Sequence, residues 1–169
     1  AKAAFHEFVE KDNAFAYVSH FGAPSVSATL NGIRRVGIPV FGFATSIGRL
    51  YVERAKTFEE GANCYPIQPI YITEGRVMVV HAITRFHAKK IGIIYTNDDT
   101  GCDLMAGIQL QCRRIGISFE SQIVQTDMSN LSRAVEELKG FSVDCVIIAA
   151  PQAFFPQIAG EVAEQEFIK

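Results

Sequence analysis

The sequence has 169 residues, of which 49% are hydrophobic and 20% are charged, so the chain can bury a sizeable core. Its formal net charge of −2, with no run of basic residues, argues against nucleic acid as a partner. No apolar run is long enough to span a bilayer, and the first residues do not have the pattern of a signal peptide.

The first part of the chain predicts a helix and two short strands. Residues 1–13 have helical character without a preceding cap or strand, and we interpret the chain as a mature or excised piece of a longer one. Strands are predicted over Phe15–Val18 and Pro39–Phe43. The stretch from Ala44 to Pro69 has little periodicity. A connection of that length is usually functional or marks a domain border.

The second part alternates between helices and strands. The apolar runs Ile91–Tyr95, Ile117–Val124 and Val143–Ile148 predict strands. Apolar residues at helical spacing indicate three helices, the first over about 71–87; they are Val79, Ile83 and Phe86, then Met105, Ile108, Cys112 and Ile115, then Leu131, Val135 and Leu138. This alternation predicts right-handed βαβ units and an α/β fold with doubly wound parallel sheets.

Two nearly identical pentapeptides, Arg34–Ile38 and Arg113–Ile117, read RRVGI and RRIGI. In each, two cations occupy the last helical turn and a glycine follows at the C-cap, which is ordinary helix-ending chemistry and the favoured interpretation. The alternative is that the chain holds two copies of one α/β architecture.

The four cysteines, Cys64, Cys102, Cys112 and Cys145, form no C-x-x-C pair and do not group with the four histidines. Neither a zinc site nor a disulfide framework is predicted, and no cofactor is expected. Cys112 and Cys145 are expected to be small buried hydrophobes. His20 follows a strand, and we interpret it as a solvated loop histidine.

Three carboxylates follow the strand that ends at Tyr95, in the stretch Asn97–Asp103. A metal site, a phosphoacceptor pocket, a helix cap and the rim of a ligand cleft would all resemble this pattern. A phosphoacceptor pocket would also need acids near the chain start and a lysine after a later strand, and the sequence has neither. A metal site is disfavoured for the same reason. We therefore predict capping, with Thr100 as N-cap, Asp103 as its partner and Asp99 near the positive helix end. Thr100 is also expected to be exposed at a cleft rim.

Five segments carry a resemblance to a known family. They are Gly22–Ser25, Phe43–Ser46, Gln68–Arg76, Tyr95–Gly101 and Ala149–Pro151. In this order and spacing the chain resembles the type I periplasmic solute-binding proteins, in particular the leucine/isoleucine/valine-binding branch that serves ABC transporters. The combination "QPxYxTEGR" followed by "YxNDDxG" is the most specific part of the resemblance.

The resemblance implies an incomplete two-lobed clamshell, with residues 1–71 in lobe 1 and residues 72–169 in lobe 2. It implies a receptor without enzymatic activity, periplasmic or extracellular and membrane-associated if a lipoprotein. This receptor would deliver an amino acid or a similar small carboxylate to an ABC permease. Because each lobe is incomplete, we expect weak binding and self-association of this piece.

We considered two other functions. A ligand-sensing domain of a membrane sensor or a transcription regulator uses the same fold. A nucleotide-dependent enzyme is disfavoured, since the sequence has neither G-x-G-x-x-G after a strand nor a G-x-x-x-x-G-K-[ST] loop.

The resemblance also implies a set of ligand-binding residues. The candidates are Phe21, Gly22, Ala23, Ala44, Thr45, Ser46, Tyr71, Thr100 and Gln152. Gly22 would let backbone N–H groups approach a ligand carboxylate, Thr45 would bond that carboxylate, and Tyr71 would reach into the cleft. Where relatives often have an aromatic ring, this chain has Thr100, which implies a roomier or more polar pocket.

Overall fold

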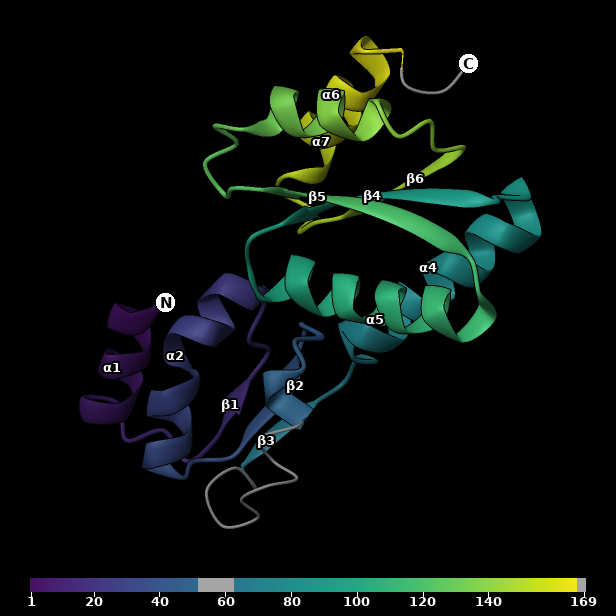
Figure 1. The fold of residues 1–169 in the computed structure, drawn as a ribbon. Coiled ribbons are helices and arrows are strands. Elements are labelled where there is room, and N and C mark those ends of the chain that lie inside the picture. The colour runs from purple at the N-terminus through teal and green to yellow at the C-terminus, as the bar shows by residue number, and fades with distance from the viewer. Residues whose placement is uncertain (52–62, 167–169) are drawn as a thin grey trace. The chain divides into compact units, whose positions relative to one another are not determined.

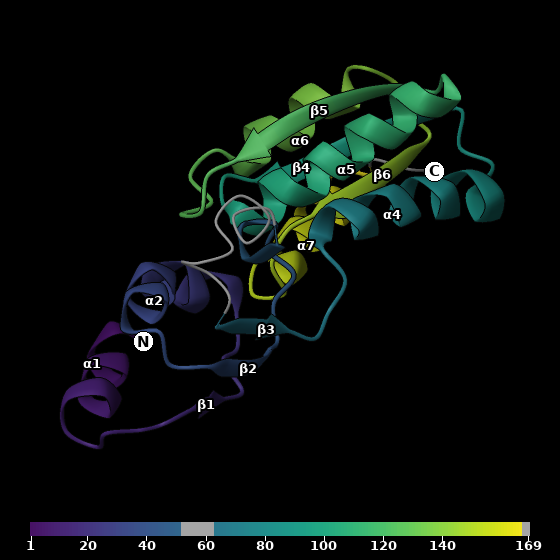
Figure 2. The same ribbon diagram turned by 90° about the horizontal axis from the view of Figure 1, so that it is seen from below.

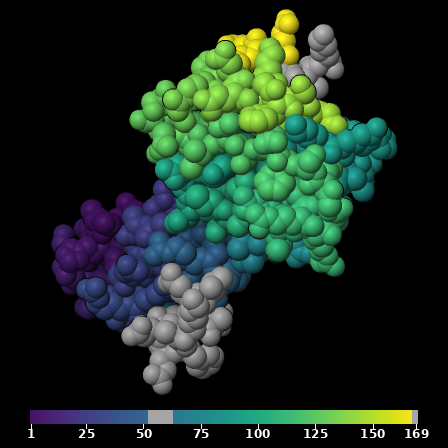
Figure 3. Space-filling model, in the orientation of Figure 1, coloured from purple at the N-terminus to yellow at the C-terminus, as the bar shows by residue number. Residues whose placement is uncertain are grey.

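The protein is described here from a computed structural model that covers residues 1–51 and 63–166. The chain divides into two compact units, Ala1–Ile70 and Tyr71–Lys169, called unit 1 and unit 2 below. Each has its own three-stranded parallel sheet. Unit 1 runs from purple to blue and unit 2 from teal to yellow in Figures 1 and 3. That the units are the two lobes of a clamshell stays a prediction.

Unit 1 contains a short sheet with strand order β1-β2-β3. Its described elements are α1 (Lys2–Glu10), β1 (Tyr17–Val18), α2 (Ala23–Val36), β2 (Val40–Phe43) and β3 (Cys64–Pro66). The predicted strands correspond to β1 and β2. β3 was not predicted, because three residues that end in proline give no usable pattern. Residues 52–62 of the aperiodic stretch lie outside the described residues.

The helices of unit 1 differ in how much they bury. α2 buries Val26, Leu30 and Ile33, whereas α1 has no buried residue. α2 ends at Gly37, whose φ of 74° is the left-handed conformation that favours glycine. The side-chain amide of Asn63 donates hydrogen bonds to the carbonyls of Ile33 and Ile38, at 2.9 and 2.8 Å. Asn63 thus joins the start of β3 to the end of α2.

Unit 2 is a doubly wound sheet, as predicted. Its elements are α4 (Tyr71–Phe86), β4 (Lys90–Thr96), α5 (Asp99–Ile115), β5 (Ser118–Val124), α6 (Leu131–Lys139), β6 (Cys145–Ala149) and α7 (Phe155–Glu164). The strand order is β5-β4-β6, so the most apolar strands lie side by side. α4 and α5 cover one face of the sheet and α6 and α7 the other, as Figures 1 and 2 show.

The close packing of α4 on α5 depends on two glycines. A Cβ on Gly75 would lie 2.2 Å from the carbonyl oxygen of Leu104, and one on Gly107 would lie 2.0 Å from that of Ile72. Only glycine therefore lets the two helices approach so closely. α5 ends at Gly116 with a φ of 73°, so both predicted glycine C-caps are confirmed.

Two residues predicted for buried helix faces are exposed. Phe86 is 65% exposed and Ile115 is 46% exposed. Both lie in the last turn of their helices. The apolar periodicity continues there, but no neighbouring element in the described part of the chain covers the side chain. None of the described helices is long and apolar enough to cross a membrane.

Candidate functional site

Six of the candidate residues come together in unit 1, where β1 and β2 end. Phe21 and Ala44 form an isolated parallel bridge. The N–H of Ala44 donates to the carbonyl of His20 at 2.9 Å, and the N–H of Gly22 donates to that of Ala44 at 3.4 Å. Ala23 and the pair Thr45 and Ser46 follow directly along the chain. These loops therefore adjoin at the carboxyl ends of neighbouring parallel strands, where open α/β sheets bind ligands.

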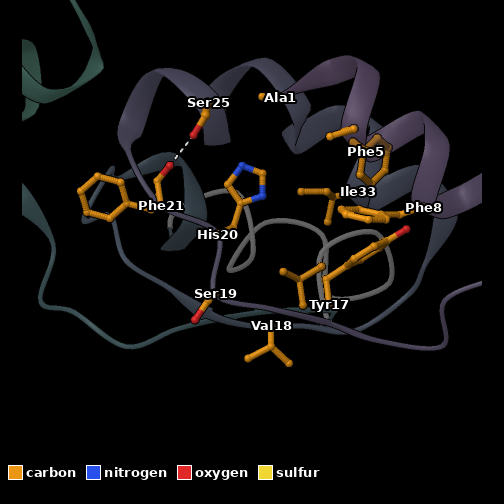
Figure 4. A pocket seen from close by; sticks show the side chains of 12 residues that line it. Ala1, Phe5, Phe8, Tyr17, Val18, Ser19, His20, Phe21, Ser25 and Ile33 are labelled. Carbon is orange, nitrogen blue, oxygen red and sulfur yellow. Dashed lines mark hydrogen bonds between the residues drawn. The ribbon is translucent and has the colours of Figure 1, made fainter.

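Gly22 is the N-cap of α2 and has a φ of 88°, a conformation that side-chain-bearing residues rarely adopt. As a glycine, Gly22 supplies no side-chain cap to this helix. The hydroxyl of Ser25 instead points back, donating to the carbonyls of Phe21 and Gly22, and Figure 4 shows the first of these bonds. The first turn of α2 therefore keeps the positive character that attracts an anion.

Thr45 and Ser46 are both buried, with 0% and 4% of their surface exposed. The hydroxyl of Ser46 donates to Gln68 Oε1 at 3.3 Å. The hydroxyl of Thr45 has no hydrogen-bond partner among the residues that the structure describes. A buried hydroxyl without a partner costs about 1–3 kcal/mol, which makes it a marked feature of this site.

In unit 2 the candidates lie at the ends of strands and starts of helices. Tyr71 begins α4 and packs, partly buried, against the larger apolar core of the unit. Gln152 is exposed in the turn that follows β6. Thr100 is only 4% exposed, so the expectation of an exposed rim position is wrong.

The predicted capping occurs at α5, but the residues differ from those predicted. Asp98, not Thr100, is the N-cap, and its Oδ1 accepts a hydrogen bond from the N–H of Gly101 at 2.8 Å. The reason is the extended backbone of Asp98, with φ −145° and ψ 176°, which places its carboxylate over the first turn. Asp99 lies in that first turn, as predicted.

Thr96 is a residue that the sequence reasoning missed. It ends β4, is 0% exposed, and its hydroxyl, like that of Thr100, has no partner within the described ranges. The only sequence signal is a threonine at the end of an apolar strand. Because a Cβ on Gly101 would lie 2.1 Å from the carbonyl oxygen of Thr96, α5 begins in tight contact with this strand end.

Cysteines and acids show no sign of a metal centre. Across residues 1–51 and 63–166, no three His, Cys, Asp or Glu side chains are arranged to hold a metal ion. No disulfide joins any two of the four cysteines. Cys64 and Cys112 are buried, Cys145 is partly buried, and Cys102 is exposed.

A cavity of about 380 Å³ lies within unit 1, lined by residues of α1, β1, α2 and β2 and by the loop between β1 and α2 (Figure 4). Its walls include the rings of Phe5, Phe8, Tyr17, His20 and Phe21, of which only Phe21 was a candidate. No sequence pattern predicted this cavity, since its walls come from separate elements.

His20 is half-buried beside this cavity, so its interpretation as a solvated loop histidine is wrong. Its ring stacks on Phe43 at 5.8 Å, and its Nε2 lies 3.4 Å from Thr29 Oγ1. Burial lowers the pKa of His20, so the ring is neutral at pH 7.

Three solved structures with the same fold are named as binding proteins for small molecules. A leucine-binding protein from Thermotoga maritima has 13% identity and a TM-score of 0.82 over 96% of this chain and 45% of its own. A branched-chain amino acid binding protein from Streptococcus pneumoniae, in complex with isoleucine, has 12% identity and a TM-score of 0.78 over 99% and 46%. A solute-binding protein from Rhodopseudomonas palustris, in complex with p-hydroxybenzoic acid, has 12% identity and a TM-score of 0.76 over 99% and 45%.

The chain thus spans less than half the length of these structures, and identities this low show the fold alone. A comparison with curated proteins gave no match. The sequence model of the periplasmic binding protein family, in contrast, matches residues 1–168. A match over nearly the whole sequence, together with the doubly wound fold, shows that this chain belongs to the periplasmic binding protein family.

Proposed function

We propose that this chain is the ligand-binding part of an extracytoplasmic receptor for a small carboxylate, either an amino acid or a related acid. Its membership of the periplasmic binding protein family supports a receptor rather than an enzyme. Isoleucine and p-hydroxybenzoic acid, the ligands of two structures with this fold, share a carboxyl group. The proposed partner is an ABC permease that takes up the released ligand.

The buried hydroxyl of Thr45 is the observation that carries the proposal. It lacks a partner among the described residues, and it belongs to the loop that pairs with the start of α2. A carboxylate bound there would accept a hydrogen bond from this hydroxyl and lie near the positive end of a helix. Both features favour an anion over a neutral ligand.

Replacing Thr45 tests the proposal. Thr45→Ala should weaken carboxylate binding by roughly 5- to 150-fold, the equivalent of about 1–3 kcal/mol for one lost hydrogen bond. NMR titration of the 169-residue chain with amino acids and aromatic acids measures this, because chemical shifts report even millimolar binding.

Thr45→Ser keeps the hydroxyl and should retain most of the affinity. Thr84→Ala is a control, since the Thr84 hydroxyl donates to the carbonyl of Val80 in its own helix. Unchanged affinity of Thr45→Ala for every acid that binds would refute the assignment.

For unit 2 we propose Tyr71, Thr100 and Gln152 as ligand contacts. The hydroxyls of Thr96 and Thr100 are both buried and lack partners in the described part of unit 2, which supports a polar rather than an aliphatic ligand group there. Thr100→Phe should therefore shift preference toward leucine and away from hydroxylated or amide-bearing acids. The ratio of the dissociation constants for leucine and for glutamine, measured before and after the substitution, checks this.

A further inference from the structure

β2 contains one residue more than its neighbour β3 pairs with. The pairing steps from Phe41–Tyr65 directly to Phe43–Pro66, so two steps along β2 match one step along β3. Gly42 is the extra residue, and its φ of 69° is the left-handed conformation that favours glycine. This arrangement is a β-bulge, which bends a strand and re-aims the side chains that follow it.

β1 has a matching kink at the same level. The register between β1 and β2 is the same before and after the bulge. Ser19 therefore lies level with Gly42, and it has a left-handed φ of 63°, which residues other than glycine rarely adopt. The N–H of Ser19 donates to the carbonyl of Phe41 at 3.1 Å. The irregularity thus crosses both strands and keeps them paired.

The bulge changes the face of the sheet to which β2 presents its next side chains. In a regular strand residues two apart share a face, so Phe43 and Thr45 would lie on the same face as Phe41. Phe41 is 45% exposed, whereas Phe43 and Thr45 are 0% exposed, as is Val40 before the bulge. The extra residue therefore turns Phe43 and Thr45 to the buried face.

The same reversal occurs in β1. Val18 is exposed, but His20, two residues further on, is half-buried and stacks on Phe43. Figure 4 shows the side chain of Val18 pointing away from the helices and that of His20 pointing toward α2. The Nε2 of His20 lies 3.4 Å from the hydroxyl oxygen of Thr29 in α2. The reversed segments of both strands therefore meet on the face that α2 covers.

We propose that Ser19 and Gly42 are positioning residues for the carboxylate site of unit 1. The inference rests on the proposed function, in which the buried hydroxyl of Thr45 donates to the ligand. An unbroken alternation would put Thr45 on the face of Phe41, away from the start of α2. The shared kink places the hydroxyl on the buried face instead, and so presents it to a carboxylate at the first turn of that helix.

The test compares two glycines that have the same conformation. Gly42→Val and Gly37→Val each force a β-branched residue into a left-handed backbone, with φ of 69° and 74°. A Cβ on Gly42 would lie 3.7 Å from the Ser19 nitrogen, an ordinary contact, and one on Gly37 would meet nothing within 4 Å in the described chain. Gly37 precedes β2 and ends α2, so both changes should destabilise unit 1. Only Gly42→Val should change the face of Thr45.

A thiol at position 45 reports that face without any ligand. In Thr45→Cys, a maleimide should label the introduced thiol as slowly as the buried Cys64 of β3, measured by peptide mass spectrometry. Adding Gly42→Val should accelerate this labelling on the order of tenfold relative to Cys64. Gly37→Val should leave the ratio unchanged, because it destabilises the unit without turning the strand. Gly42→Asn should also leave it unchanged, since asparagine tolerates the left-handed conformation.

Binding is measured on chains that keep Thr45, by NMR titration with isoleucine and with p-hydroxybenzoic acid as probes. Gly42→Val should weaken binding as much as Thr45→Ala does, by roughly 5- to 150-fold, while Gly37→Val and Gly42→Asn should not. Circular dichroism establishes that each variant is folded. If Gly42→Val does not fold, the milder pair Gly42→Ala and Gly37→Ala takes its place.

The two readouts separate this inference from the proposed function. A labelling ratio that Gly42→Val leaves unchanged, or that Gly37→Val raises equally, overturns the positioning role, whether or not any acid binds. Binding that Thr45→Ala weakens and Gly42→Val does not weaken also overturns it, and leaves the proposed function standing. If neither probe binds the unsubstituted chain, the proposed function fails for these acids, and the labelling ratio still decides what turns Thr45.

Discussion

Unit 2 is built from long, interlocked elements, and unit 1 from short ones. The strands of unit 2 have seven, seven and five residues, and those described in unit 1 have two, four and three. Two glycines let α4 and α5 interlock, whereas α1 buries no residue at all. In unit 1, the hydrogen bonds of Asn63 join the end of α2 to the start of β3, beside a small core that includes Leu30, Ile33 and Phe43. The difference indicates that close helix packing contributes more to unit 2, and individual polar contacts more to unit 1.

The largest effect is expected for Gly107→Ala, which places a methyl group 2.0 Å from the carbonyl oxygen of Ile72. Helices α4 and α5 must then separate, which should lower the free energy of unfolding of unit 2 by about 3 kcal/mol or more. Amide hydrogen exchange resolves the two units, so protection should fall in unit 2 and persist in unit 1.

Gly160→Ala in α7 is the control, because nothing lies within 4 Å of its added Cβ. It should stabilise the helix by about 0.5–1 kcal/mol. Equal losses of protection in both units on Gly107→Ala would show that they unfold together, and the proposed contrast would fail.

An intermediate effect is expected for Asn63→Ala in unit 1. The substitution leaves the carbonyls of Ile33 and Ile38 without their side-chain donor, at a cost of about 1–3 kcal/mol. Hydrogen exchange should accelerate at the end of α2 and in β2, with unit 2 unaffected. Asn97→Ala, which removes an exposed bond to Gln125 Oε1, should change the stability by less than about 0.5 kcal/mol.

The smallest effect is expected for Tyr17→Phe. The hydroxyl of Tyr17 is buried and has no partner in the described part of unit 1, so its removal should leave stability at pH 7 unchanged or raise it slightly. Burial, and then the charge of Asp12, raise the pKa of Tyr17 above its usual 10.0. The folded state therefore favours the neutral form of Tyr17. The resulting contribution to the free energy of unfolding is present below pH 10 and is lost as the pH rises above it.

Thermal unfolding of the wild type and of Tyr17→Phe from pH 8 to pH 11 measures this difference. The wild type should lose more stability above pH 10 than the variant. Parallel curves would show that Tyr17 is as solvated when folded as when unfolded.

The contrast between the long elements of unit 2 and the short elements of unit 1 also explains which elements could be predicted from the sequence. The apolar runs of unit 2 are long enough to identify each strand, and the Arg-Arg-x-Gly signals predicted both glycine C-caps. β3 was missed because three residues carry no periodicity. The choice of Asp98 over Thr100 as N-cap depended on backbone angles, since both side chains are competent caps.

In the candidate site, the positions of the loops could be predicted from the sequence, but the surroundings of their side chains could not. Sequence order and spacing alone placed Gly22 and Thr45 in loops after strands, and the bridge between Phe21 and Ala44 joins those loops. The unpartnered hydroxyls of Thr45 and Thr96 depend on what surrounds them in three dimensions, which no local pattern encodes. The cavity beside His20 was missed for that reason as well.

The exposure of Cys102 gives the protein a natural attachment point for a fluorescent dye. Cys64 and Cys112 are buried, and burial raises the pKa of the Cys112 thiol to about 11, so its thiolate is scarce at the pH of a labelling reaction. A maleimide dye should therefore attach first at Cys102, although burial and the charges of Asp98, Asp103 and Asp99 raise its pKa too. The dye would be two residues from Thr100, a proposed ligand contact, so a change in its emission on adding a small carboxylate would test that proposal without any introduced cysteine.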